Sequence, residues 1–414
     1  MITLIEARGY RALKFVRQEL SEFHVLVGPN ASGKTTFLDV PAFLARLVTD
    51  GLGAALDERS SQFSDLTWAR SGDPFELAIE VEIPEQRRGH LAAGIDTARY
   101  EVRVGVSASD EVVLKSERVL LKARQPRTPV SHELFPKAAI GTGTILEGGS
   151  SRNGSQNVVA KIEDGNDNFY GEHGSKLNLS FKLGPRKSAL ANLPADEERF
   201  PVATWLRDYL VAGVQPLTLN SLHLRRASPP NQGPGFRTDG SNLPWVAANL
   251  IKHHPDRFND WMGHLSTALR DFESLRIIQR DDDKHSYMML KYNGGLEVPS
   301  WMASDGTLRL LALTLPAYLP DCRGAFLIEE PENGIHPRAV EAVMQSLSSV
   351  YGAQILVATH SPVVLSSTPP DKVLCFAKDD TGATDIVTGD RHPALSAWQG
   401  EMNIGSLFAA GVLG

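Results

Sequence analysis

Short apolar runs and one amphipathic stretch organise the first part of the chain. A run rich in apolar residues at positions 23–27 predicts a buried strand that leads directly into Gly28. From Lys34 onward apolar residues recur every three or four positions, which predicts a helix. Alternating apolar residues predict three further strands, at 75–83, 100–106 and 112–121. We therefore expect a strand, a turn and a helix, followed by a sheet.

The middle of the chain differs in composition from both ends. Between residues 125 and 184, glycine, serine and asparagine dominate stretches such as 141–157, which predicts flexible loops between edge strands. One short strand is expected at 177–183. From about 200 to 275 the apolar spacing becomes helical, and a segment rich in proline and glycine at 228–240 predicts an exposed loop.

Strands return after about residue 287, and the chain ends in alternating strands and helices, a pattern typical of a parallel α/β sheet. We predict an α/β fold with a mixed or parallel sheet that is assembled from both ends of the chain and flanked by helices. The predicted segments are an N-terminal part of this head (1–85), a β-rich insertion (86–195), a helical arm or lid (196–285) and a C-terminal part (286–414).

Composition narrows the class of protein. Apolar residues make up 42% and charged residues 22%, as in ordinary globular proteins, and no run of 18 apolar residues predicts a membrane span. The net charge of −7 argues against a surface that is basic all round, although a local basic groove stays possible. Cys322 and Cys375 lie far apart without metal-ligand spacing, so we expect reduced core thiols in a soluble, cytoplasmic protein.

A phosphate-binding pattern lies between the first buried strand and the first helix. Backbone N–H groups of such a glycine-containing loop surround phosphate oxygens, and the helix N-terminus adds its dipole. Lys34 supplies a point charge for the β- and γ-phosphates, and the Thr35 hydroxyl is a ligand for Mg²⁺. The predicted nucleotide-binding residues are Gly28, Pro29, Asn30, Ala31, Ser32, Gly33, Lys34, Thr35 and Thr36.

Two later strand ends carry polar motifs. Four apolar residues at 325–328 predict a buried strand, and Glu329 and Glu330 follow at the end where ligands bind such sheets. Neighbouring strand residues point to opposite sides, so we expect Glu329 to hold Mg²⁺ and Glu330 to face the attacking water. His360 follows another apolar strand and is expected to bond the γ-phosphate, although a lone histidine there is more often structural.

A third motif opens an apolar helix. Ser304, Asp305 and Gly306 precede it, and they offer a hydroxyl, N–H groups and the positive end of a helix dipole. From physics alone, the simpler interpretation is that Ser304 is an ordinary helix N-cap.

The order of these motifs resembles the ABC-type ATPase heads of the SMC, RecF and OLD class. The resemblance covers about residues 1–85 and 285–414, and the string from Ile328 to Pro337 is highly specific to that class. It implies an ATP- and Mg²⁺-dependent ATPase that works as a homodimer or higher oligomer, with each ATP held between two heads. By the same resemblance Ser304, Asp305 and Gly306 act across the dimer interface, and Asn333 and Gly334 form a loop that contacts the partner head.

This chain departs from the family pattern at several positions. Glu329 stands where many relatives have aspartate, so its metal contact is expected to run through water. Asp305 replaces the glycine of transporter-type signatures. The glutamine that family members often have after the first helix is not clear here. Gln62 is a candidate, and an ordinary surface glutamine explains it at least as well.

Two cellular roles remain open. In one, the chain resembles free-standing heads of bacterial phage-defence systems and controls a separate effector, a nuclease or toxin. In the other, it is a DNA-binding repair ATPase like RecF, with Arg225, Arg226 and Arg237 touching phosphates, although such clusters are more often solvated or ion-paired. The acidic chain and the glycine- and serine-rich insertion favour effector control, and a transporter motor fits poorly.

Overall fold

The computed structural model describes residues 1–125, 134–137, 141, 143–147, 154–173, 178–233, 235–396 and 405. The chain forms two compact units. Unit 1 combines Met1–Val214 with Leu374–Gln399 and Leu413–Gly414, and unit 2 combines Gln215–Val373 with Gly400–Val412.

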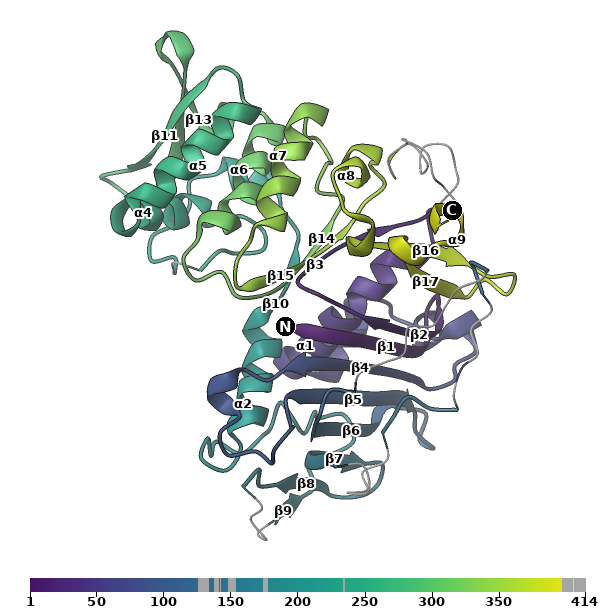
Figure 1. The fold of residues 1–414 in the computed structure, drawn as a ribbon. Helices are drawn as coiled ribbons and strands as arrows, with labels where there is room; N and C mark the ends of the chain where they lie inside the picture. Colours follow the sequence, from purple (N-terminus) through teal and green to yellow (C-terminus); the bar gives the residue numbers. More distant parts are fainter. Residues whose placement is uncertain are drawn as a thin grey trace. The chain divides into compact units, whose positions relative to one another are not determined.

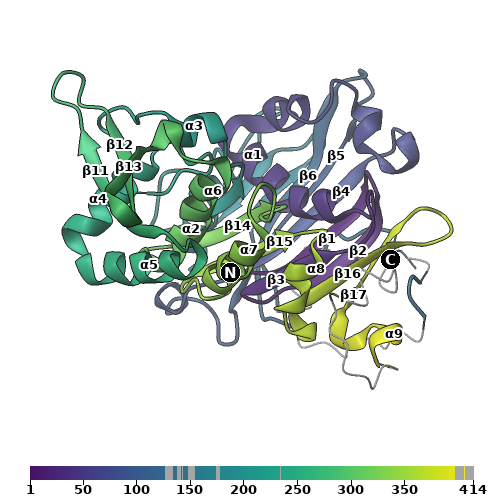
Figure 2. The ribbon, with the colours of Figure 1, turned by 90° about the horizontal axis from the view of Figure 1, so that it is seen from above.

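An antiparallel sheet of eight strands dominates unit 1 (Figure 1). Apolar side chains alternate along its strands, as in Leu77, Ile79 and Val81, and they face the long helix α1, Lys34–Asp57, which packs on β1 and β4. Figure 2 shows α1 beside these strands from a second direction. In spatial order the strands are β2 (Leu13–Glu19), β1 (Ile2–Tyr10), β4 (Phe75–Glu82), β5 (Thr97–Val106), β6 (Val112–Lys122), β7 (Gln156–Ile162), β8 (Asp167–Tyr170) and β9 (Asn178–Phe181).

A second set of strands in unit 1 joins the two ends of the chain. Strand β3 (Phe23–Val27) lies beside β16 (Val373–Lys378), and β16 pairs antiparallel with β17 (Thr384–Thr388). The rings of Phe37 and Phe376 meet edge to face with centroids 5.6 Å apart, which ties α1 to β16. The expectation that both ends of the chain build one sheet is confirmed.

The remaining helical elements of unit 1 are short. The helix α2 (Pro201–Asp208) continues directly into a π-helical turn, η5 (Tyr209–Gly213), which packs on α1. The others are η1 (Phe63–Leu66), η2 (Trp68–Arg70), η3 (Glu85–Arg87), η10 (Gly389–Arg391) and α9 (Pro393–Ser396).

Unit 2 contains parallel strands with helices and a small antiparallel sheet. Strands β14 (Gly324–Glu329) and β15 (Ala353–Ala358) pair in parallel, and β10 (Val214–Leu217) lies beside β14. The small sheet has the order β11 (Phe272–Gln279), β12 (Ser286–Tyr292), β13 (Leu296–Pro299). The helices are α3 (Ser221–Arg225), α4 (Leu243–His253), α5 (Pro255–Ala268), α6 (Asp305–Thr314), α7 (Pro337–Ser348) and α8 (Pro362–Ser366), with short turns η6 (Asn293–Gly295), η7 (Ser300–Met302), η8 (Leu315–Tyr318) and η9 (Pro370–Lys372).

The structure differs from the sequence-based expectation in the stretch from 200 to 275. That stretch contains α2, α4 and α5, as predicted, but it also contains strand β10, and β11 begins already at Phe272. Strand β10 has only four residues and carries Pro216, which an edge strand tolerates because one of its sides needs no ladder hydrogen bonds. A run of four residues is too short for its spacing of apolar positions to distinguish a strand from a helix. Because the residues around it have helical spacing, the sequence did not predict this strand.

Two further expectations concern loops and membranes. Much of the glycine- and serine-rich stretch 141–157 lies outside the described residues. Among the helices that the structure describes, none has the length and apolar character needed to cross a membrane. The four predicted sequence segments stay predictions of domain organisation.

Candidate functional site

The phosphate-binding pattern of unit 1 forms the loop between β3 and α1. Ala31 and Gly33 both have left-handed backbone, with φ of 62° and 107°. A β-carbon on Gly33 would lie 2.3 Å from Thr384 Oγ1, so only glycine fits there without a shift of β17. The Gly33 carbonyl accepts the first helical hydrogen bond, from Phe37 N at 2.8 Å.

Lys34 is buried inside this loop. Its ammonium group donates to the carbonyl oxygens of Gly28 at 2.8 Å and Pro29 at 3.0 Å. Ser32 is 2% exposed, and its hydroxyl has no hydrogen-bond partner among the described residues. A buried hydroxyl without a partner is costly, and a phosphate oxygen would provide the missing acceptor. The loop therefore fits a phosphate group.

The remaining residues of the pattern line the outer side of the loop. Pro29, Asn30 and Thr35 are exposed, and Thr36 is half-buried. Gln62 is also exposed and precedes η1, where its backbone N–H donates to Ser60 Oγ at 3.1 Å. Its assignment as the family glutamine stays a prediction.

In unit 2 the two predicted carboxylates lie in different backbone conformations. Glu329 ends β14 and is exposed, whereas Glu330 has left-handed backbone with φ of 47°. A non-glycine residue in that region costs on the order of 1–3 kcal/mol and persists only where its surroundings hold it. Hydrogen bonds on both sides hold it here, from Glu330 N to Ala358 O at 2.8 Å and from Asn333 N to Glu330 O at 3.0 Å. Glu330 is therefore not the next residue of a regular strand, as the alternation argument assumed.

His360 lies next to this carboxylate. Its Nε2 atom is 3.5 Å from Glu330 Oε1. Glu332 fixes the histidine backbone, because its Oε1 accepts hydrogen bonds from Thr359 Oγ1 and from His360 N. The other oxygen, Glu332 Oε2, is buried and has no hydrogen-bond partner in the described part of the chain. The structure thus brings Glu330 and His360 together and adds Glu332 to the same cluster.

The third motif begins α6. Ser304 is its N-cap, and Ser304 Oγ accepts from Thr307 N at 3.1 Å. The guanidinium group of Arg225 donates to Asp305 Oδ1 at 2.7 and 2.9 Å and to Trp301 O at 3.0 Å. The predicted N-cap is confirmed. Arg225 forms an ion pair with Asp305 within unit 2. An ion pair of this kind was the alternative to phosphate contact that the sequence analysis left open.

The loop 333–335 packs against the first turn of α6. A β-carbon on Gly306 would lie 2.4 Å from Gly334 O, and Arg309 Nη1 donates to Asn333 O at 3.1 Å. The residues assigned to the trans signature and to the dimer loop are therefore neighbours within unit 2.

Of the two residues predicted to hold Mg²⁺, Thr35 lies in unit 1 and Glu329 in unit 2. Among the described residues there is no cluster of three or more histidine, cysteine, aspartate or glutamate side chains that could hold a metal by itself.

A family model described as "AAA domain, putative AbiEii toxin, Type IV TA system" matches residues 23–366. The chain belongs to this family. The match includes the phosphate loop, the carboxylates after β14 and His360, so this AAA-domain family covers every site residue that the sequence predicted.

Solved structures support the fold of this AAA-domain chain. An SMC head bound to the C-terminal winged-helix domain of ScpA is 15% identical, with a TM-score of 0.55 over 94% of this chain and 97% of the other. The SMC head domain from Pyrococcus furiosus, with an extended coiled coil and bound to the C-terminal domain of ScpA, is also 15% identical, with a TM-score of 0.50 over 94% and 96%. The predicted resemblance to the SMC and RecF class of ATPase heads is confirmed at the level of the fold.

One curated relative also matches. Protein ea59 of Escherichia phage lambda is 29% identical over 141 residues, which are 32% of this chain and 26% of ea59. The match therefore spans about a quarter of that relative's length.

Three contributing residues escaped the sequence analysis of this AAA-domain chain. Glu332 lies inside the string Ile328 to Pro337, and its carboxyl group there could have suggested a role. Arg309 had only its helical spacing from Gly306 as a signal. Thr384, which donates to Ser32 O at 2.9 Å, is 352 positions away from it and follows no motif.

Proposed function

We propose that this chain binds Mg²⁺-ATP through the phosphate loop of unit 1. The observation that carries the proposal is the buried Lys34 ammonium group, held by two carbonyls of the loop, next to the Ser32 hydroxyl that has no partner among the described residues. An ATP phosphate would take both groups as donors, and it would gain the N–H groups at the start of α1.

We further propose that ATP is hydrolysed, with Glu330 orienting the attacking water or accepting its proton. The left-handed backbone of Glu330 is a locally strained conformation of the kind that concentrates at functional sites. His360, whose ring nitrogen is 3.5 Å from the Glu330 carboxylate, is assigned to the γ-phosphate, and Thr35 and Glu329 are assigned to Mg²⁺. Bound Mg²⁺ supplies positive charge to the β- and γ-phosphates, which lowers the cost of charge that builds up during phosphoryl transfer.

Two copies of the chain are proposed to close around ATP. In that arrangement Ser304, Asp305 and Gly306 of one copy face the γ-phosphate bound to the other, and Asn333 and Gly334 contact the partner copy. The packing of Gly306 on Gly334 supports a common role of the α6 N-terminus and the loop 333–335 at the dimer interface. Because the two segments are in contact, movement of one would displace the other. Hydrolysis would then reopen the pair.

The cellular role that we propose is control of a separate effector protein in defence against phage, in the cytoplasm. The family description names a toxin of a type IV toxin–antitoxin system, and a stretch of the chain is similar to a phage protein. The SMC head with the same fold was crystallised bound to a second protein, ScpA, so the fold is compatible with a protein partner. The effector is expected to be a nuclease or a toxin.

The variant Glu330→Gln tests the assignment of the base. It removes the proton acceptor but keeps the size of the side chain, so ATP should still bind while steady-state hydrolysis falls by about 10²-fold or more. The variant with ATP should elute as a stable dimer in size-exclusion chromatography with light scattering. The control is Glu341→Gln, an equivalent change at an exposed position of α7, which should hydrolyse ATP at the wild-type rate. Hydrolysis by the Glu330 variant at the wild-type rate would refute the assignment.

Effector control is tested by co-expressing the Glu330→Gln variant with the product of each neighbouring gene. A stoichiometric complex that forms with ATP and not without it supports the role. A homodimer that carries nucleic acid and no second protein supports the RecF-like alternative instead.

A further inference from the structure

The two faces of the eight-stranded sheet differ in chemistry. One face is mostly apolar and packs on α1 at β1 and β4, whereas the other carries many charged side chains. On that charged face the side chains of Glu76, Arg99 and Glu101 are fully buried. Charged side chains are rarely buried without partners, so something other than solvent must satisfy them.

Residues 143–147, here called the strap, lie over this face. Ile145 N donates to Glu76 Oε2 at 2.8 Å, and Ile145 O accepts from the Arg99 guanidinium group at 2.8 Å. Two residues further, Glu147 N donates to the Glu101 carboxylate at 3.1 Å, and Glu147 O accepts from Arg118 at 2.6 Å. The sheet thus binds both backbone groups of alternate strap residues.

These four contacts depend on the strap's backbone and not on its side chains. A carboxylate that accepts from an N–H group and a guanidinium that donates to a carbonyl would bind any extended chain in the same way. Recognition of alternate residues is also the pattern by which extended peptides bind at protein surfaces. The charged face therefore has the properties of a peptide-binding groove that this chain fills with its own segment.

Side chains of the strap add a simple sequence preference. The Thr144 hydroxyl donates to the Glu76 carboxylate at 2.9 Å, and Ile145 is buried, with 7% of its surface exposed. Leu146 is half-buried, and its N–H bonds back to Thr144 Oγ1 at 3.1 Å. The Glu147 carboxylate pairs with Lys122. The groove accordingly prefers a hydroxyl residue, an apolar residue, any residue and an acidic residue in succession.

Ion pairing gives the acidic position its importance. The Glu147 carboxylate pairs with Lys122 and lies 3.7 Å from Arg99 Nε, and both of these cations are buried. Without the strap, Lys122 and Arg99 lose one carboxylate partner. A replacement peptide with an acidic side chain at this position would restore that partner.

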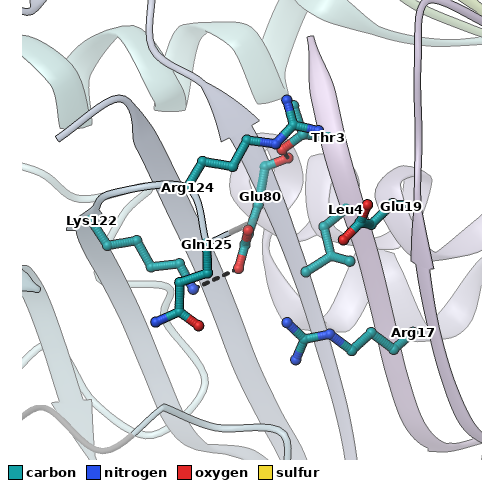
Figure 3. A pocket seen from close by; sticks show the side chains of 8 residues that line it. All are labelled: Thr3, Leu4, Arg17, Glu19, Glu80, Lys122, Arg124 and Gln125. Carbon is teal, nitrogen blue, oxygen red and sulfur yellow. Dashed lines mark hydrogen bonds and ion pairs between the residues drawn. The ribbon is translucent and has the colours of Figure 1, made fainter. Parts of the chain in front are cut away.

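The face continues beyond Glu147 as a shallow, open hollow. Lys122 connects the two regions, because it pairs with Glu147 of the strap and with Glu80 at 2.7 Å in the hollow (Figure 3). Arg17 and Arg124 also line the hollow, together with Glu19 (Figure 3). A peptide longer than the strap would find further cations there.

We propose that the charged face is a docking groove for an extended segment of a partner protein, and that the strap is its internal occupant. The partner segment carries the succession hydroxyl, apolar, any residue, acidic, and it displaces residues 143–147. The proposal is independent of ATP binding and of hydrolysis.

The test uses the full-length chain with residues 144–147 replaced by Gly-Ser-Gly-Ser, and a fluorescein-labelled peptide of sequence Gly-Thr-Ile-Leu-Glu with blocked ends. Fluorescence anisotropy is measured without nucleotide. In the wild-type protein the strap competes for the groove through its backbone and its side chains, whereas the replaced segment competes through its backbone alone. The peptide should therefore bind the replaced variant about tenfold or more tightly than it binds the wild-type protein. A peptide with lysine in place of the glutamate is the control and should bind the variant at least about tenfold more weakly.

Three results would overturn the proposal. These are failure of the peptide to saturate a variant whose circular dichroism is native, equal affinity for variant and wild type, and equal affinity of the two peptides. If the four-residue replacement does not fold, Glu147→Gln takes its place, because it removes only one charge of the strap. The peptide should then bind this variant about threefold or more tightly than it binds the wild type, and equal affinity overturns the proposal.

Discussion

Gly306 and Gly334 approach so closely that a β-carbon built on Gly306 would lie 2.4 Å from the carbonyl oxygen of Gly334. No real β-carbon tolerates such a distance to a backbone atom. The glycine at the third position of the Ser304 motif is therefore required for packing inside unit 2, whatever its role toward a nucleotide. The glycine that we propose as part of the signature is thus also subject to a local packing constraint.

Replacing Gly306 by alanine should destabilise the protein. The new methyl group forces α6 and the loop 333–335 apart, and overpacking of this kind costs about 1–3 kcal/mol in the free energy of unfolding. Gly263 is the matched control, since it is exposed in α5 and a β-carbon added there would have no other atom within 4 Å. Gly263→Ala should stabilise the protein by about 0.8–1 kcal/mol through helix propensity. Urea denaturation of both variants checks the opposite signs, and a stabilised Gly306 variant would contradict the packing argument.

Replacing Thr384 by valine should weaken the phosphate loop. The change keeps the shape of a buried side chain but removes the donor to Ser32 O, so a buried carbonyl loses its partner at a cost of about 1–3 kcal/mol. Ser32 belongs to the proposed phosphate-binding loop, and the hydrogen bond from Thr384 holds its backbone in place. We therefore also expect the Thr384→Val variant to bind ATP more weakly in calorimetry.

The control for this change lies on the same strand. The Thr388 hydroxyl is buried and has no hydrogen-bond partner in the part of the chain that is described, so Thr388→Val should be neutral or stabilising. Equal losses of stability in the two variants would show that the Thr384 hydrogen bond is not the cause.

Elements with a clear local period could be predicted from the sequence. Strand β4 follows the alternation at 75–83, and α1 begins at Lys34 as the apolar spacing indicated. Strand β14 ends at Glu329, where the first carboxylate was expected. In these elements the same residues determine both the local conformation and the buried face, so a short window of sequence contains the information.

Contacts between distant segments could not be predicted. The hydrogen bond from Thr384 to Ser32 and the strap on the charged face both join segments that share no motif. The left-handed backbone of Glu330 was also missed, because it depends on bonds from the next strand to a residue whose type does not favour it. Tertiary contacts determine such features, and one sequence does not reveal them.

Both thiols should be unreactive in the folded protein. Burial raises the pKa of Cys322 and of Cys375 to about 12, so almost no thiolate exists near neutral pH, and the sulfur atoms are shielded from reagents. We expect no reaction with Ellman's reagent at mildly alkaline pH and stoichiometric reaction of both thiols in concentrated guanidinium. Fast reaction of one thiol in the native protein would show local opening around that cysteine.

Glu117 should make stability fall as pH rises. Complete burial raises the pKa of its carboxyl group, against the opposing effect of hydrogen bonds from Ser188, Ala189 and Leu190. Below the pKa of the unfolded state both forms are protonated and the group contributes no pH dependence. Between that pKa, about 4.3, and the raised folded pKa, the unfolded state ionises first and gains stability relative to the folded state. The variant Glu117→Gln has no carboxyl group at this position and so does not lose stability in this way. The difference in the free energy of unfolding, variant minus wild type, should therefore increase from pH about 4 to about 7 in urea titrations. A difference that decreases over this range would mean that the folded state lowers the pKa of Glu117, contrary to the effect of its burial.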